Sequence, residues 1–145
     1  MGMIVLDASV VAKWYNKEEY SDKAAEILGN YIEGLFDIKE PPLILYEVSN
    51  AIYKNDQLSV EDAVRAVESL IRLIGETVKT PSNEDFKEAM KIARLLKISF
   101  YDSSYIQISK KYNAKLITAD DEIYEKAKRL TQVAHIRMFK APGGI

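Results

Sequence analysis

Two patterns of apolar residues alternate along this chain. Short apolar runs, typical of β-strands, are followed by longer stretches in which apolar residues recur every three or four positions, as on one face of a helix. The runs that predict strands are residues 3–6, 36–40, 77–80, 98–100, 115–118 and 133–138. The stretches that predict helices are residues 8–15, 18–35, 43–54, 59–75, 82–96, 102–112 and 121–130.

Strands that alternate with helices are typical of a parallel sheet with helices packed on both of its faces. We therefore expect an α/β fold in three layers, α/β/α, around a central and mainly parallel sheet of about five short strands. The chain has 145 residues, 48% of them apolar, so residues 1–145 are expected to form a single domain. In such sheets ligands bind beyond the carboxyl ends of the strands, near the point where the strand order reverses.

Three aspartates lie where a predicted strand is followed by a helix. Asp7, Asp102 and Asp120 each follow such a strand within two residues. Because the carboxyl ends of parallel strands share one edge of the sheet, these side chains are expected to converge there. Each aspartate alone is better explained as a helix N-cap. Three aspartates together favour a cation site, since Ser, Thr or Asn would cap equally well, and the two roles are compatible.

A fourth carboxylate comes from the predicted helix 43–54. Glu47 lies at the edge of the apolar stripe of that helix, and Asn50 follows three residues later, so both can face one cleft. The alternative is a solvent-exposed boundary glutamate, with Asn50 as an ordinary surface residue. Asp121 and Glu122 follow Asp120 directly. They are interpreted as first-turn acids that the helix dipole favours, although one of them can still assist a metal.

Composition limits the kind of metal site that the chain can build. There is no cysteine, and the one histidine, His135, lies in an apolar run and is interpreted as structural. Cysteine-based zinc and iron–sulfur sites are therefore excluded, as are sites with several histidines. Oxygen ligands remain, and these suit Mg²⁺, Mn²⁺ or Ca²⁺. The net charge of −2 argues against tight non-specific binding of nucleic acid, but not against a phosphodiester substrate held by cations.

Other surface features each have two explanations. A basic stretch near the C-terminus either contacts RNA or is a solvated face; it comprises Lys126, Lys128, Arg129, Arg137 and Lys140. Three aromatic residues either stack on bases or pack in the core, and packing is favoured; they are Trp14, Tyr15 and Tyr101. No apolar run is long enough for a membrane span, and the N-terminus lacks the basic region of a signal peptide. A cytoplasmic protein without membrane contact is expected.

Four short motifs resemble those of PIN domains and occur in the order of that family. Residues 3–12, MIVLDASVVA, resemble its opening strand, which ends in Asp followed by a small residue and Ser. Residues 42–50, PLILYEVSN, resemble its second motif, a Glu with Asn three residues later. Residues 98–106, ISFYDSSYI, and residues 116–120, LITAD, resemble its third and fourth motifs. The set covers essentially the whole chain and is most similar to VapC-like toxin ribonucleases of prokaryotic toxin–antitoxin pairs.

The resemblance implies a catalytic and metal-binding cluster that is supported by nearby polar side chains. The cluster would consist of Asp7, Glu47, Asp102 and Asp120, and the supporting residues would be Ser9, Asn50 and Thr118. We expect Asp7 and Asp102 to be inner ligands, and Glu47 and Asp120 to bind a second ion or orient the attacking water. The resemblance further implies one or two Mg²⁺ or Mn²⁺ ions, hydrolysis of RNA, a homodimer and an antitoxin partner.

Two other functions are compatible with the same fold. One is a catalytically idle binding module, against which the four acids argue, because an RNA binder gains nothing from a negative pocket. The other is a nuclease that acts on DNA or flap structures. A flavodoxin-like signalling domain with acids around one Mg²⁺ is weakened by the absence of a suitably placed lysine after a late strand.

Overall fold

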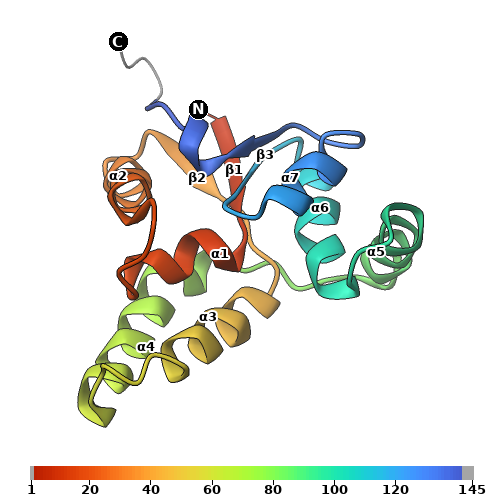
Figure 1. Ribbon diagram of the computed structural model, residues 1–145. Coiled ribbons are helices and arrows are strands. Elements are labelled where there is room, and N and C mark those ends of the chain that lie inside the picture. Colours follow the sequence, from red (N-terminus) through yellow and green to blue (C-terminus); the bar gives the residue numbers. More distant parts are fainter. Residues whose placement is uncertain (1, 142–145) are drawn as a thin grey trace.

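The computed structural model describes residues 2–141, in which a parallel sheet is covered by helices on both faces (Figure 1). Its strands are β1 (Gly2–Leu6), β2 (Phe36–Ile38), β3 (Lys115–Thr118) and β4 (Val133–His135). They form one four-stranded sheet in the order β2-β1-β3-β4, with every neighbouring pair parallel. Leu6 is paired with Ile117, so the ends of the two central strands lie side by side. The three-layer α/β prediction is confirmed.

The connections between the strands are helical. The α-helices are α1 (Ala8–Val11), α2 (Ser21–Ile32), α3 (Leu43–Tyr53), α4 (Val60–Ile74), α5 (Asn83–Leu96), α6 (Phe100–Tyr112) and α7 (Asp121–Ala127). Three short 3-10 segments are η1 (Ala12–Trp14), η2 (Gly75–Thr77) and η3 (Ile136–Met138). Helices α3 and α4 pack together as a pair that extends away from the sheet, whereas α5 packs on α6 beside it (Figure 1). None of the helices within residues 2–141 has the length and apolar character needed to cross a bilayer.

The sheet has four strands rather than about five, because two predicted strands are absent. At residues 98–100, the Ser99 hydroxyl accepts the Asp102 amide and caps a helix that begins at Phe100. At residues 77–80, the Thr77 hydroxyl donates to the Ile74 carbonyl at 2.6 Å, which continues the end of α4 as a 3-10 turn. The remainder of that segment contributes a single bridge, from Val78 to Glu40.

The strand order explains where a site can form. The chain passes from β1 outward to β2, then returns across β1 to β3, so the connections leave these neighbouring strands in opposite directions. Such a reversal opens a crevice at the carboxyl ends of the strands. Below it the core is closed by fully buried side chains, among them Leu6, Ile106 and Leu116. The crevice therefore has a rigid floor.

The apolar stripes of the outer helices are less buried than their spacing predicts. On α5, Ala89, Ala93 and Leu96 are buried as expected, but Phe86 is 52% exposed and Met90 is similarly exposed. On α4, Leu70 and Ile74 are buried, but an exposed apolar row remains, formed by Val60, Val64 and Ile71. Periodicity identified these faces correctly as apolar, but apolar character alone does not determine what covers a face.

Candidate active site

Among the four predicted acids, Asp7 accepts the most side-chain hydrogen bonds. It follows β1 directly and is the N-cap of α1, where its Oδ1 accepts the Ser9 amide at 3.1 Å and also the Ser9 hydroxyl. Its Oδ2 accepts the hydroxyl of Thr118 on β3. The side chain thus fills the cap role, and its hydrogen bond from Thr118 across to β3 shows that the cap role leaves room for a role in a site. Burial raises its pKa from 3.8 to about 6, against the opposing effect of these two hydroxyl groups.

The hydroxyls of Ser9 and Thr118 also connect the end of β1 to the end of β3. The Ser9 hydroxyl accepts the Ala119 amide at 2.9 Å, and the Thr118 hydroxyl accepts the Asp120 amide at 3.0 Å. Asp120 in turn caps α7, with its Oδ1 2.9 Å from the Ile123 amide, and remains exposed. Each hydroxyl therefore donates to the buried carboxylate while it accepts from the loop after β3, which fixes the loop relative to β1.

The other two predicted acids come from helices. Asp102 lies in the first turn of α6 and not at a strand end, so the reasoning that placed it there was wrong. Its charge nevertheless raises the pKa of both Asp7 and Glu47, which places it near them. Glu47 is half-buried on α3 and accepts the buried Tyr105 hydroxyl at 2.6 Å. Burial raises the pKa of Glu47, and burial likewise raises that of Asp102, with Asp120 adding to the effect.

A cleft of about 440 Å³ lies beside these residues; Glu47 and Asp120 line it, whereas Asp7 and Asp102 do not. Its lining includes Ser9, Glu47, Asn50 and Asp120, together with the two cations Lys13 and Lys54. Within residues 2–141 the Asn50 side chain makes no hydrogen bond to a carboxylate, so a supporting role for it stays a prediction. The charge of Asp102 adds to the raised pKa of Asp7 and of Glu47, and the charge of Asp120 adds to that of Asp7 and of Asp102, so four segments that are far apart in sequence bring negative charge to one region.

The donor chemistry of the cluster fits a hard divalent cation. All four candidate ligands are carboxylates, and the Asp7 carboxylate accepts three hydrogen bonds where about four acceptor positions exist, so one stays open. Within the part of the chain that the structure describes, no three acidic or histidine side chains converge closely enough to hold an ion by themselves. Mg²⁺ retains several waters, so one or two direct carboxylate ligands are sufficient for it.

A further carboxylate in this region, Glu40, was not predicted from the sequence. It is 0% exposed, and its Oε2 accepts the amide of Leu6 at 3.0 Å, one residue before Asp7. Its Oε1 has no partner among the described residues. Burial raises its pKa well above the usual value, and the charge of Asp7 adds to this. The signal was the alternation in residues 36–40, which puts Glu40 on the same face as the buried Phe36 and Ile38.

Asp121 lies beside the cluster but is turned away from it. Its Oδ1 is 3.2 Å from His135 Nε2 and 3.3 Å from Arg137 Nη1. These contacts favour Asp120 over Asp121 as the acid of the fourth motif. The aromatic residues Trp14 and Tyr15 are held within the protein, since the indole donates to the Ala24 carbonyl at 2.9 Å and the phenol bonds the Ser69 hydroxyl.

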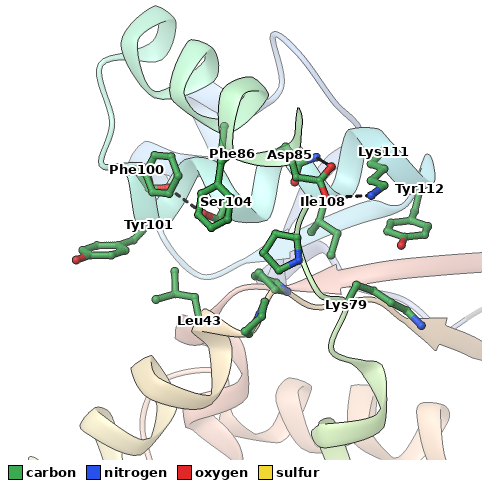
Figure 2. A pocket seen from close by; sticks show the side chains of 15 residues that line it. Leu43, Lys79, Asp85, Phe86, Phe100, Tyr101, Ser104, Ile108, Lys111 and Tyr112 are labelled. Carbon is green, nitrogen blue, oxygen red and sulfur yellow. Dashed lines mark hydrogen bonds and ion pairs between the residues drawn. The ribbon is translucent and has the colours of Figure 1, made fainter. Parts of the chain in front are cut away.

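The most apolar pocket lies elsewhere, between α5, α6 and the loop that contains Lys79 (Figure 2). It measures about 220 Å³, and its walls include the parallel rings of Phe86 and Phe100. Asp85 and Lys111 form an ion pair at its rim. None of the four candidate ligands lines it, so its shape gives no reason to place the chemistry there.

Comparison with known proteins identifies the family and supports the fold. Ribonuclease VapC3 of Pyrobaculum aerophilum is 28% identical over 126 residues, which cover 85% of this chain and 93% of the relative. The solved structure of PAE2754 from the same organism has a TM-score of 0.68 at 23% identity and covers 94% of this chain and 90% of its own. VapBC-1 from nontypeable Haemophilus influenzae has a TM-score of 0.63 at 17% identity, with 93% and 98% covered. The profile of the PIN domain matches residues 4–129, and this chain therefore belongs to the PIN domain family.

Proposed function

We propose that this protein is a metal-dependent endoribonuclease that hydrolyses RNA phosphodiester bonds and acts as the toxin of a type II toxin–antitoxin pair. The observation that carries the proposal is the buried Asp7 carboxylate, which is fixed by two hydroxyls and coupled electrostatically to Asp102 and Asp120. A purely structural cap would not need such neighbours, because their repulsion destabilises its charge.

The proposed roles follow from burial and hydrogen bonding. Asp7 and Asp102 would hold Mg²⁺ or Mn²⁺, while Glu47 and Asp120 would hold a second ion or orient the attacking water. A divalent cation would offset the charge that cleavage builds on the phosphate and would make a water more acidic. The Ser9 and Thr118 hydroxyls would keep the Asp7 carboxylate in one orientation, as supporting groups around metal ligands commonly do.

The similar proteins support nuclease activity. VapC3 carries the name ribonuclease, and the second Pyrobaculum aerophilum relative, VapC9, which is 28% identical over 86 residues, carries the name exonuclease. We favour internal cleavage because the cleft is open, and a circular RNA distinguishes the two modes: an endonuclease cuts it, whereas an exonuclease leaves it intact.

The decisive test is cleavage of a mixed RNA pool with Mn²⁺, with Mg²⁺ and with EDTA. Wild type would be compared with Asp7→Asn and with Asp37→Asn, a matched loss of charge at an exposed strand residue outside the cleft. We expect metal-dependent cutting that disappears in Asp7→Asn and persists in Asp37→Asn. Cutting by Asp7→Asn at the wild-type rate would refute the site. Preference for matched DNA oligonucleotides would instead identify a DNA or flap nuclease, and a folded protein without cutting or metal binding would identify the binding module.

We propose that the antitoxin partner covers exposed apolar residues of the α3–α4 pair. Tyr46 and Tyr53 on α3 are largely exposed, as is the row on α4 that contains Val60 and Ile71. Because α3 also carries Glu47, a partner seated there would reach the cleft. We expect Ile71→Asp to weaken neutralisation by the antitoxin and to leave cleavage by the free toxin unchanged. Full neutralisation of this variant would place the partner elsewhere.

We further propose that two copies associate through the apolar pocket of Figure 2. A two-fold interface uses the same surface on both copies, so exposed rings such as Phe86 would pack on each other, with the Asp85–Lys111 ion pair of each copy at the rim. Light scattering after size exclusion should give twice the chain mass for wild type and a monomer for Phe86→Asp. A dimeric Phe86→Asp, or a monomeric wild type, would overturn this assignment.

A further inference from the structure

A second polar pocket adjoins the acid cleft at the end of β4. It measures about 230 Å³, and its lining combines two cations and two acids with two rings: Lys13, Arg137, Glu19, Asp121, Tyr20 and His135. Lys13 and Ala119 line both the pocket and the cleft, so the two hollows are neighbours along one surface. In the sheet, His135 is paired with Thr118, the residue whose hydroxyl donates to Asp7. Anything bound in the pocket would thus lie beside the proposed reaction centre.

The pocket is built around a histidine with a defined proton position. His135 is buried, and its Nδ1 accepts the Arg137 amide at 3.1 Å. In the neutral ring the proton must then be on Nε2, which is 3.2 Å from Asp121 Oδ1. Asp121 is 86% exposed in its side chain, so the pair with His135 orients a carboxylate that would otherwise move freely.

Two more side chains of the pocket, those of Arg137 and Tyr20, are held in place by neighbouring groups. Arg137 lies 3.3 Å from Asp121 Oδ1, and its guanidinium stands 5.6 Å over the Tyr124 ring, yet 44% of its side chain is exposed. Tyr20 packs edge-on to His135 at 5.8 Å and has a left-handed backbone, with φ of 67°. That conformation costs a non-glycine residue on the order of 1–2 kcal/mol, and such strain is typically retained where side-chain placement matters.

RNA that reaches the negatively charged acid cleft needs a positively charged group nearby, and this pocket contains one. RNA flanking the cut carries a phosphate on every nucleotide, and the carboxylate cluster repels each of them. A cation beside the cluster is therefore needed to hold the strand. Arginine suits this role because its planar fork of donors matches phosphate oxygens, and Nη1 alone is used by Asp121 within residues 2–141. Single-stranded RNA is commonly bound by stacking its bases on tyrosine.

We propose that this pocket is a nucleotide subsite: Arg137 binds the backbone phosphate of the residue next to the cleaved bond, and Tyr20 contacts its base. His135 positions both residues, since its ring packs on Tyr20 and accepts the Arg137 amide. The inference rests on the proposed ribonuclease function and adds to it the path of the RNA, which runs from the acid cleft across Ala119 to the end of β4.

The test compares Arg137→Ala with Lys128→Ala. Lys128 is a matched control because its ammonium lies 5.2 Å over the same Tyr124 ring but lines neither hollow. Steady-state cleavage of a short fluorescent RNA should show KM raised about tenfold in Arg137→Ala with kcat nearly unchanged, which is the usual strength of one charge-assisted hydrogen bond. Lys128→Ala should leave both constants unchanged.

Binding without cleavage gives an independent measurement. In an Asp7→Asn background, fluorescence anisotropy at several salt concentrations should show that Arg137→Ala lowers the salt dependence by about one released counterion. Removing one base from the RNA should weaken binding severalfold when Tyr20 is present and have little further effect in Tyr20→Leu. If Tyr20→Leu fails to fold, Arg137→Lys serves instead, since it keeps the charge and loses the fork, and KM should rise.

Asp121→Asn separates the subsite from a metal role for that acid. Because Asp121 offsets the Arg137 charge, its neutralisation should tighten RNA binding, whereas loss of a metal ligand would abolish cleavage. Wild-type KM and salt dependence in Arg137→Ala would refute the subsite while the ribonuclease stands. Absence of cleavage and of RNA binding by wild type would remove the proposed function itself, and the subsite with it.

Discussion

Replacement of Asp7 by asparagine should abolish cleavage and at the same time stabilise the metal-free protein. In the folded chain the pKa of Asp7 is about 6, against 3.8 for a solvated aspartate, because burial disfavours the charge. The folded state therefore holds the proton more tightly than the unfolded state. Below pH 3.8 both states are protonated and the carboxyl causes no loss, whereas stability falls as pH rises from 3.8 to 6 and stays low above that.

The magnitude follows from the two pKa values. Ionisation of Asp7 should destabilise the folded chain by about 1.6 kcal/mol near pH 5 and by about 3 kcal/mol near pH 7.5. In Asp7→Asn the side-chain oxygen would still accept from Ser9, but the amide nitrogen cannot accept the Thr118 proton, which costs about 1 kcal/mol at either pH. The net gain for Asp7→Asn is then about 2 kcal/mol near pH 7.5.

Urea unfolding of both proteins in EDTA would measure this. The free energy of unfolding of Asp7→Asn should exceed that of wild type by more at pH 7.5 than at pH 5, and this increase should be about 1.4 kcal/mol. An effect of the amide that is the same at both pH values does not contribute to the increase. A difference that stays constant over this range would show that Asp7 is not a buried carboxylate of raised pKa.

Three further substitutions test neighbouring groups. Glu40→Gln keeps an oxygen that accepts the Leu6 amide and removes an ionisable group from a buried position. The free energy of unfolding of the metal-free protein, measured with urea above pH 4.5, should therefore rise, and a fall would contradict the burial of Glu40. Tyr105→Phe removes the hydroxyl that lowers the pKa of Glu47, so the acidic limb of the pH–rate profile should move to higher pH. Thr118→Val keeps the shape but leaves Asp7 without its second hydroxyl, and should cost about 1–3 kcal/mol together with most of the cleavage rate.

The parts of the fold that sequence could predict are those set by local pattern. The strand at residues 3–6 and the helices with a regular stripe were recovered because burial on one side imposes a period. The strands predicted at 77–80 and 98–100 were wrong because, in each segment, a hydrogen bond from a single hydroxyl side chain favours a helical turn over strand pairing. Thr77 extends a helix end and Ser99 begins a helix, and neither effect changes the apolar count of the segment.

The positions of the four candidate acids could be predicted from the sequence only in part, and their assignment as a metal site stays a prediction. Asp7 and Asp120 follow strands as expected, whereas Asp102 comes close to them from a helix turn. Glu40 was missed because its side chain takes the place of a strand partner for the Leu6 amide, after its own backbone has turned to pair with Val78. Whether a side-chain oxygen replaces a strand carbonyl in this way depends on the three-dimensional path of two segments, and the sequence pattern gives only a weak indication of it.

The electrostatic cost of the cluster also indicates what should offset it. Crowded carboxylates destabilise the metal-free chain, so a divalent cation that binds the folded state should restore what the charge of Asp7 removes. At a concentration of about 30 times its Kd, an ion stabilises the folded state by about 2 kcal/mol. This equals the net advantage of about 2 kcal/mol worked out above for Asp7→Asn near pH 7.5. Titration with Mn²⁺ near pH 7.5 should therefore bring wild type up to the stability of Asp7→Asn, which should itself respond little. If both proteins gained equally, the ion would bind elsewhere, and the carboxylate cluster would lose its assignment as the metal site.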